Sequence, residues 1–242
     1  MFGYNGKVLR VNLKERTIKI EALNLEEAKK FIGGRGLGTK MLMDEIDPMV
    51  DPLSPENKLI IITGPLTGTP VPTGGRYMVV TKSPLSGTIA CSNSGGYWGA
   101  EFKAAGYDAI IFEDKADVPV YLTIIDEKVE IKDAGSLWGK LVTETTDIIK
   151  KEMPDKSRVL TIGPAGERLS KMAAIMNDYD RAAGLPTYGT AVLVNILNES
   201  GLHPTNNFCR INYCSWNGAL LNYLRLLETV GKKSKLLNCL KA

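Results

Sequence analysis

One order of elements occurs twice in this chain, and this repetition limits the folds that it can adopt. Residues Lys58–Thr63 form an apolar run that ends in Gly64-Pro65, and Arg158–Ile162 form a second run that ends in Gly163-Pro164. Short apolar runs bounded by turn residues are typical of buried strands. The period is about 100 to 115 residues, far longer than a solenoid unit of roughly 20 to 50, so the pattern predicts duplication inside one domain.

The elements around the two runs recur in the same order. The first run follows a hairpin over 8–22 and helices over 25–32 and 37–46. The second run follows a hairpin over 120–134 and a helix over 143–153. Further predicted elements are strands over 76–81, 108–112 and 171–176 and a helix over 98–105. Because hairpins outnumber strand-helix-strand crossovers, we expect an α+β fold, an internally duplicated antiparallel or mixed β-sheet domain with flanking helices.

The bulk composition excludes several classes of protein. The chain has 242 residues, of which 44% are hydrophobic and 24% charged, so it can bury one large core or two small ones and is not a disordered chain. The first residues form no basic and apolar leader, and no apolar stretch approaches the roughly 18 residues of a membrane span. We therefore expect a cytoplasmic protein that does not associate with membranes.

Charge and cysteine are both concentrated near the end of the sequence. Residues 208–242 carry six Lys or Arg against Glu228 alone, which leaves the rest of the chain slightly acidic although the formal net charge is +3. The basic balance therefore gives no reason to expect a nucleic-acid partner. Three of the four cysteines also lie there, too few and too uneven for a disulfide scaffold, so we expect reduced thiols.

Glycine gathers in two loops, Gly64–Arg76 and Ser92–Gly96. A third candidate segment, Asn177–Gly184, occupies in the second half the place of Ser92–Gly96 in the first half. Glycine lets backbone N–H groups approach an anion closely, the helix that starts at Trp98 adds a favourable dipole, and Arg76 adds a bidentate donor. This pattern predicts a ligand with two phosphates. The alternative, that the loops are ordinary turns, stays open at this level.

Several segments, in the same order, resemble the N-terminal domain of the aldehyde ferredoxin oxidoreductases. The resemblance covers residues 1 to about 184. The motifs that carry it include Asp51–Ile61, Gly64–Thr69, Pro72–Tyr77, Thr81–Leu85, Ser92–Tyr97, Gly106–Ala109, Ile162–Glu167 and Arg181–Gly184. In that family the domain forms the base on which a tungsten bis-pterin (molybdopterin-type) cofactor lies, with a magnesium ion between the two pterin phosphates.

The resemblance implies a set of site residues in this chain. The implied cofactor contacts are Arg76, Asn93, Gly95, Arg181, Ala182 and Gly184. The backbone carbonyls of Asn93 and Ala182 are the implied magnesium ligands, which fits the preference of magnesium for hard oxygen donors. The resemblance further implies oxidation of an aldehyde to a carboxylic acid, with electrons passing through a 4Fe-4S cluster to ferredoxin. No catalytic residue is expected in this chain itself.

The sequence departs from the family after Gly184. Residues 185–208 resemble a piece of the second domain of the family, so the strand that closes the first domain is expected to be missing, and residues 209–242 form a divergent basic tail. Cys209, Cys214 and Cys239 lack the spacing that holds an iron-sulfur cluster, so the cysteine motif of the family is absent. The single histidine, His203, precedes a proline and is not expected to act as a general base.

Two functional hypotheses follow. In the first, the chain is part of an aldehyde ferredoxin oxidoreductase that carries the pterin cradle but is inactive alone. In the second, it is a non-catalytic pterin-binding module or subunit. The resemblance implies ferredoxin and an aldehyde as partners and allows a homodimer. Which aldehyde is used, whether tungsten or molybdenum is bound, and whether the junction reflects a real product, a degenerate gene or a gene-assembly error stay open.

Overall fold

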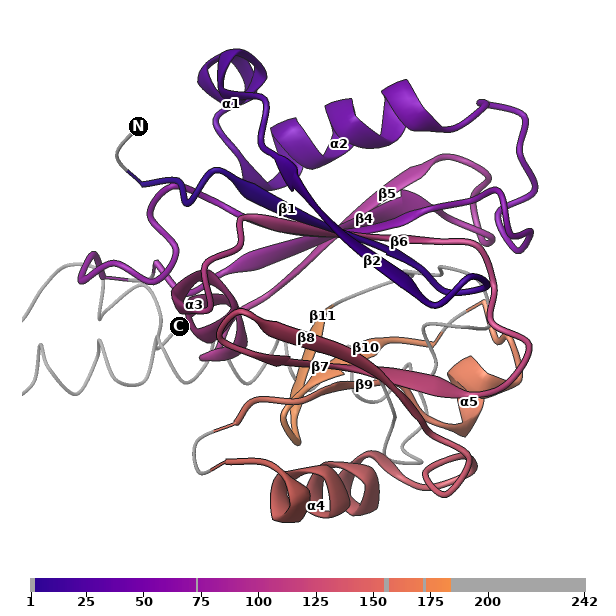
Figure 1. Ribbon diagram of the computed structural model, residues 1–242. Helices are drawn as coiled ribbons and strands as arrows, with labels where there is room; N and C mark the ends of the chain where they lie inside the picture. Colours follow the sequence, from indigo (N-terminus) through magenta and orange to yellow (C-terminus); the bar gives the residue numbers. More distant parts are fainter. Residues whose placement is uncertain (1–2, 73, 155–156, 172, 184–242) are drawn as a thin grey trace, which may run out of the picture. The chain divides into compact units, whose positions relative to one another are not determined.

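The first half of the chain forms a six-stranded mixed sheet. The computed structural model describes residues 3–183 except 73, 155–156 and 172, all within one compact unit. The strands of this sheet are β1 (Lys7–Asn12), β2 (Thr17–Ala22), β3 (Leu59–Thr63), β4 (Tyr77–Lys82), β5 (Ile89–Ser94) and β6 (Ala109–Glu113). Their order is β2-β1-β6-β3-β4-β5, and only the β1–β6 pair is parallel (Figure 1). The last strand in sequence, β6, therefore lies in the middle of the sheet.

Helices α1 (Leu25–Phe31) and α2 (Gly34–Glu45) cover one face of this sheet (Figure 1). The side chain of Asn24 accepts hydrogen bonds from the backbone N–H groups of Glu26 and Glu27, at 3.1 and 3.2 Å, so it is the N-cap that starts α1. Helix α3 (Trp98–Ala104) connects β5 to β6. Its Trp98 ring stacks on Phe102, with the ring centroids 5.0 Å apart, and packs against the core.

The second half largely repeats the order of the first: its hairpin strands have the same length, whereas the strands after its helix α4 are shorter. It contains β7 (Val120–Ile125), β8 (Lys128–Asp133), α4 (Val142–Glu152), β9 (Leu160–Thr161), α5 (Pro164–Glu167), β10 (Ile175–Asn177) and β11 (Arg181–Ala183). Strands β7 and β8 form a hairpin, and β9, β10 and β11 form a separate antiparallel sheet in the order β11-β10-β9. In Figure 1 these strands lie below the six-stranded sheet, and α4 lies below them.

The central strands of the large sheet are buried on both faces. Leu59 and Ile61 of β3 point into a core shared with the second half, whereas Ile60 and Ile62 point toward α2. Leu160 of β9 lies in the shared core. This burial explains why β3 is an unbroken apolar run rather than an alternating one.

The expected α+β class is confirmed, with a mixed sheet and flanking helices. Most predicted elements lie within two residues of the observed ones, but the predicted strand over 171–176 is reduced to Ile175–Asn177. Two strands were not predicted. Ser92–Ser94 belong to β5 and Arg181–Ala183 form β11, so two segments that the glycine content marked as loops are partly edge strands.

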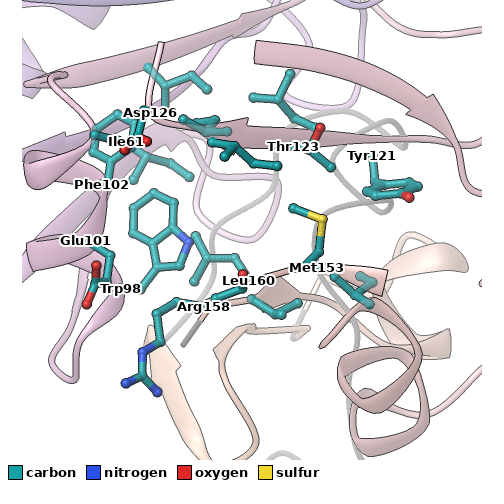
Figure 2. Close-up of a pocket in the computed structure, with 18 of the residues that line it drawn as sticks. Ile61, Trp98, Glu101, Phe102, Tyr121, Thr123, Asp126, Met153, Arg158 and Leu160 are labelled. Atoms are coloured by element: carbon teal, nitrogen blue, oxygen red, sulfur yellow. The ribbon is translucent and has the colours of Figure 1, made fainter. Parts of the chain in front are cut away.

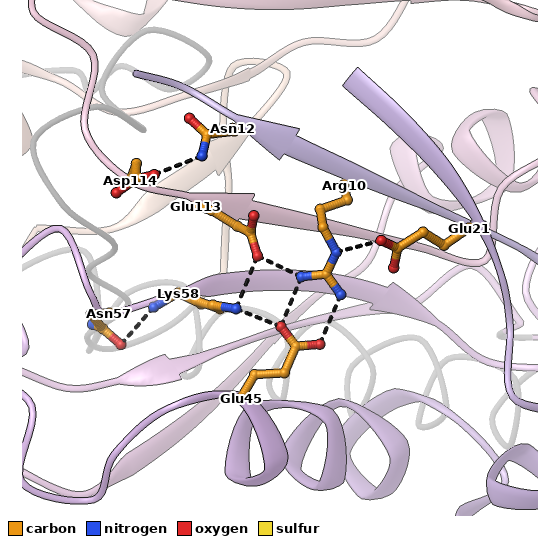
Figure 3. A network of polar contacts seen from close by, with 8 residues as sticks. All are labelled: Arg10, Asn12, Glu21, Glu45, Asn57, Lys58, Glu113 and Asp114. Atoms are coloured by element: carbon orange, nitrogen blue, oxygen red, sulfur yellow. Dashed lines mark hydrogen bonds and ion pairs between the residues drawn. The ribbon is translucent and has the colours of Figure 1, made fainter. Parts of the chain in front are cut away.

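An ion-pair network ties α2 to the strands at one end of the large sheet (Figure 3). Arg10 of β1 donates to both oxygens of Glu45 in α2, at 2.8 and 2.9 Å. Lys58, just before β3, lies 2.7 Å from Glu45 and 2.9 Å from Glu113 of β6. Burial alone would raise the pKa of Glu45 and of Glu113, but hydrogen bonds from Lys58 and Arg10 lower both below the usual value.

None of the helices among the described residues is long and apolar enough to cross a lipid bilayer.

Candidate functional site

The predicted residues of the first half lie together at one end of β4 and β5. Arg76 immediately precedes β4, and Asn93 lies on β5 directly opposite Met78 of β4. Arg76 Nη1 donates a hydrogen bond to Asn93 Oδ1. The turn before Arg76 needs glycine, because a Cβ on Gly75 would lie 2.8 Å from the carbonyl oxygen of Gly96. Close packing of two glycine loops therefore places the Arg76 guanidinium beside β5.

The second half meets the first at the same place. The side-chain amide of Asn177, at the end of β10, donates to the carbonyl oxygen of Gly95 at 2.6 Å. The hydroxyl of Ser94 donates to the carbonyl oxygen of Arg181 at 3.4 Å. The structure thus brings Arg76, Asn93 and Gly95 together with Arg181 and its neighbour Ala182, across more than 80 residues of sequence.

Gly96 shows how tight this contact is. Its φ of +87° lies in the left-handed region that favours glycine, and a Cβ there would lie 2.9 Å from both Arg181 Cδ and Asn177 Nδ2. By contrast, a Cβ on the adjacent Gly95 would meet no atom within 4 Å, apart from those of its chain neighbours. The two halves are therefore tightly packed at Gly96, whereas space remains beside the Cα of Gly95.

The two halves present equivalent positions to the site. In the first half Asn93 pairs with Met78, which pairs on its other side with Ile62, two residues before Gly64. In the second half Ala182 pairs with Met176, which pairs with Thr161, two residues before Gly163. The matching registers make Asn93 and Ala182 counterparts on the two outer strands, β5 and β11. The third predicted position of the second half, Gly184, lies outside the described residues.

The electrostatics of the site favour an anion. Arg76 and Arg181 are both exposed, and neither forms an ion pair with any described residue. Asp178, a buried acid that follows Asn177, is already engaged, with Lys150 Nζ at 3.1 Å and an Arg158 nitrogen at 3.6 Å. Two guanidinium groups without carboxylate partners are suited to bidentate bonds with phosphate.

Other groups near the site are neutral or buried. Burial raises the pKa of Tyr77, the residue after Arg76, so its phenol stays protonated. Asn177 Oδ1 is buried and accepts no hydrogen bond within the described part of the chain. The described residues contain no cluster of three His, Cys, Asp or Glu that could hold a metal ion. The tail cysteines and His203 lie outside the described residues.

Sequence reasoning did not single out Asn177, Ser94 and Gly96, which join the two halves. All three belong to the segments Ser92–Gly96 and Asn177–Gly184 noted above, and Asn177 stands directly after the apolar residues 175 and 176. The signal in the sequence that could have identified Asn177 is a polar residue directly after a buried strand. Its partner across the molecule could not be identified without the tertiary structure.

Comparison with curated proteins finds oxidoreductases that are similar to this chain over most of its length. The tungsten-containing aldehyde ferredoxin oxidoreductase of Pyrococcus abyssi is 52% identical over 261 aligned positions, which cover 86% of this chain and 43% of the relative. The aliphatic sulfonate oxidoreductase, WOR-like subunit, of Pyrococcus furiosus is 41% identical over 208 positions, which cover 79% of this chain and 33% of the relative. The chain thus spans less than half the length of these relatives.

A solved structure shows the same fold. The active-site complex BamBC of benzoyl coenzyme A reductase, in complex with 1,5-dienoyl-CoA, superposes with a TM-score of 0.74 at 38% identity, covering 82% of this chain and 32% of that one. The family profile described as "Aldehyde ferredoxin oxidoreductase, N-terminal domain" matches residues 8–193. With that match spanning most of the 242 residues, the chain belongs to the aldehyde ferredoxin oxidoreductase family through its N-terminal domain.

Proposed function

We propose that the junction of β5 and β11 holds a tungsten bis-pterin cofactor through its phosphates, as the base of an aldehyde ferredoxin oxidoreductase. The contacts would be Arg76, Asn93 and Gly95 from the first half and Arg181, Ala182 and Gly184 from the second. The observation that carries this proposal is the direct contact between the halves, in which Asn177 Nδ2 donates to the Gly95 carbonyl at 2.6 Å. It sets two exposed arginines on neighbouring segments, one from each half.

The residues present fit such a ligand. Space is open at Gly95, where an added Cβ would meet no non-neighbouring atom within 4 Å, so a bulky group can approach the backbone there. The Asn93 side chain is already held by Arg76. A guanidinium fixed by one hydrogen bond retains further N–H donors for a phosphate.

A bridging magnesium ion fits the matched register of the two halves. Asn93 and Ala182 occupy equivalent positions on β5 and β11, so their carbonyl groups are the proposed pair of protein ligands. Magnesium accepts few protein ligands and retains water and phosphate oxygens. Two backbone carbonyls with two phosphates would meet that requirement without an acidic side chain.

When bound, the cofactor would supply two-electron oxidation of an aldehyde to a carboxylic acid, and ferredoxin would accept the electrons. This chain would contribute binding and orientation alone. The alignment to the Pyrococcus abyssi relative runs over 261 positions, more than the 242 residues of this chain, so the relative has internal residues without a counterpart here. Such a gap supports the proposal that sequence after Gly184 has been lost.

The test of the cradle is cofactor retention by Arg76→Ala. Removing one charge-assisted hydrogen bond weakens binding by roughly 1.5 to 3 kcal/mol, about 10- to 150-fold in affinity. The full chain is produced with tungstate, and pterin fluorescence after denaturation and tungsten content are measured per chain. Arg168→Ala, which changes an exposed arginine at the end of α5, is the matched control. Equal retention by both variants would refute the assignment of Arg76.

The chain alone is expected to lack aldehyde-oxidising activity and to contain negligible iron, because its cysteines lack the spacing of a cluster. Dye reduction with several aldehydes is measured on cofactor-loaded chain, and iron and sulfide are measured after anaerobic reconstitution. Turnover comparable to that of a full-length relative would show that the chain is a self-sufficient enzyme. Stoichiometric iron with a charge-transfer band would show that the interpretation of the cysteine spacing is wrong.

A further inference from the structure

Asn177 is a fully buried amide at the end of β10. Its backbone is fixed from both sides, because it is paired with Leu160 of β9 and with Arg181 of β11. Its Nδ2 donates to the carbonyl oxygen of Gly95 at 2.6 Å, whereas its Oδ1 accepts no hydrogen bond from the described residues. Burying an amide oxygen without a partner is unfavourable compared with burying an apolar side chain of similar size. The hydrogen bond to Gly95 is the contribution that an apolar side chain at this position could not make.

The hydrophobic core, rather than this hydrogen bond, holds the two halves of the chain together. Ile162 of the second half shares one buried core with Ile61 of the first. Leu160, the strand partner of Asn177, lines a largely apolar pocket together with Trp98 of α3 (Figure 2). Apolar contacts are non-directional, so they can join the halves without fixing the orientation of any single peptide group. The hydrogen bond from Asn177 therefore has a local consequence, at Gly95, that the core does not provide.

The backbone at Gly95 is intrinsically free to change its conformation. Gly95 lies just beyond the pairing of β4 with β5, whose last pair is Tyr77 with Ser94. Glycine has the largest conformational freedom of all residues, and the following Gly96 adopts a φ of +87°. Because the peptide group between them has glycine on both sides, it could rotate by a half-turn at little steric cost. The hydrogen bond from Asn177 to the Gly95 carbonyl selects one of the two orientations.

The orientation of this peptide group decides whether an anion meets a donor or an acceptor. The C=O and N–H groups of a trans peptide point in opposite directions. With the Gly95 carbonyl turned toward Asn177, the N–H group of Gly96 points away from that amide. A half-turn would place the carbonyl oxygen on that side instead. Phosphate oxygens bind N–H donors and are repelled by carbonyl oxygens, so only the observed orientation suits an anion on the side opposite to Asn177.

We propose that Asn177 is a positioning residue of the phosphate site, which holds the Gly95–Gly96 peptide group in the orientation that presents an N–H group to a phosphate. This inference rests on the proposed cofactor site and adds a residue to it that does not itself touch the ligand. Holding the flexible glycines before the ligand arrives removes part of the entropic cost of binding. A carboxylate of the same shape could not replace the amide, because it carries no donor and would add a negative charge near the phosphate.

The test compares cofactor retention with folding in two variants of the full chain. Asn177→Leu and Asn177→Asp are produced with tungstate, and tungsten and pterin are measured per folded chain after gel filtration over a series of dilutions. Asn177→Leu removes the donor without adding a charge, so it should weaken retention about 3- to 10-fold. Asn177→Asp should weaken it by more than about 10-fold at pH 9, because the carboxylate also repels the phosphate.

A pH profile separates positioning from a merely structural role. A protonated carboxyl regains an O–H donor for the Gly95 carbonyl, and burial raises the pKa of a carboxyl group. The charges on the neighbouring Asp178 and Arg181 act on the introduced carboxyl in opposite directions, so burial sets the direction. Retention by Asn177→Asp, relative to the unmodified chain at each pH, should therefore recover as the pH falls from about 9 to about 5, whereas Asn177→Leu should show no recovery. A loss by Asn177→Asp that is the same at every pH would overturn the proposal.

Asn57→Asp is the matched control. Asn57 is also a buried amide that donates to backbone carbonyls, those of Pro52 and Lys82 at 2.8 and 3.1 Å, and it lies at the opposite end of β4 from Arg76. Its replacement should lower stability without lowering retention per folded chain. Full retention by the Asn177 variants while Arg76→Ala loses cofactor would overturn this inference alone, and full retention by Arg76→Ala as well would overturn the cofactor site itself. If one Asn177 variant does not fold, the other decides.

Discussion

Replacing Asp108 should strongly destabilise the fold, because its buried carboxylate holds several segments of the chain together. Its side chain is 3% exposed and lies just before β6. It accepts hydrogen bonds from the backbone N–H groups of Asn5 and Gly6, at 3.1 and 2.6 Å, and pairs with the ammonium group of Lys103. Lys103 also donates to the Gly64 carbonyl at 3.3 Å. One carboxylate thus fixes the N-terminal segment, α3 and the start of the first glycine loop.

The expected loss in the free energy of unfolding follows from the groups that the substitution leaves without partners. Asp108→Ala removes the acceptor for two backbone N–H groups and leaves Lys103, whose side chain is 10% exposed, without its ion-pair partner. Breaking a buried pair from one side costs about 3 to 5 kcal/mol, because the remaining charge stays buried. Asp108→Asn keeps the shape and one acceptor oxygen, so we expect a smaller loss of about 1.5 to 3 kcal/mol.

A double-mutant cycle identifies the cause. The free energy of unfolding is measured by denaturant titration for Asp108→Asn, for Lys103→Met and for the double variant that carries both changes. Since the second change removes the stranded charge, the double variant should be more stable than the sum of the single losses predicts, by about 1 kcal/mol or more. Strictly additive losses, or a loss below about 1 kcal/mol for Asp108→Ala, would refute this account of the buried pair.

Two further predictions concern the ion network and the contact between the halves. The pKa of Glu45 is lowered by Arg10 and Lys58, so its stabilising effect should be complete above the unfolded value of about 4.3 and lost as the pH falls below it. Glu45→Gln should cost about 1 to 2 kcal/mol at pH 7 and flatten the fall of stability between about pH 4 and pH 2, measured by denaturation at several pH values. Gly96→Ala should cost about 2 to 4 kcal/mol and lower pterin retention, because it adds a clash to the strain of a positive φ. Gly87→Ala, at a φ of +69° with no non-neighbouring atom within 4 Å of its added Cβ, should lose only about 1 to 2 kcal/mol, and equal losses would contradict the packing argument.

The sequence by itself determined the repeated order of elements and most of their positions. Hairpins and helices are encoded by local sequence patterns. Asn24 is the N-cap of α1, and the short apolar run of β3, bounded by turn residues, is typical of a strand that is buried on both faces. The segments around Arg76, Asn93 and Arg181 could also be selected from their glycine and arginine content, and the family resemblance supplied their expected roles.

Only the tertiary structure decided how these pieces meet. The hydrogen bond from Asn177 to Gly95 joins residues 82 positions apart, and no local pattern encodes such a partner. The strand order likewise depends on a crossover that inserts β6 between β1 and β3. This order is stabilised by the two cores that pack on opposite faces of the sheet. The two faces of β3 could likewise be assigned to their two cores only from the tertiary structure, because burial is a property of the assembled fold.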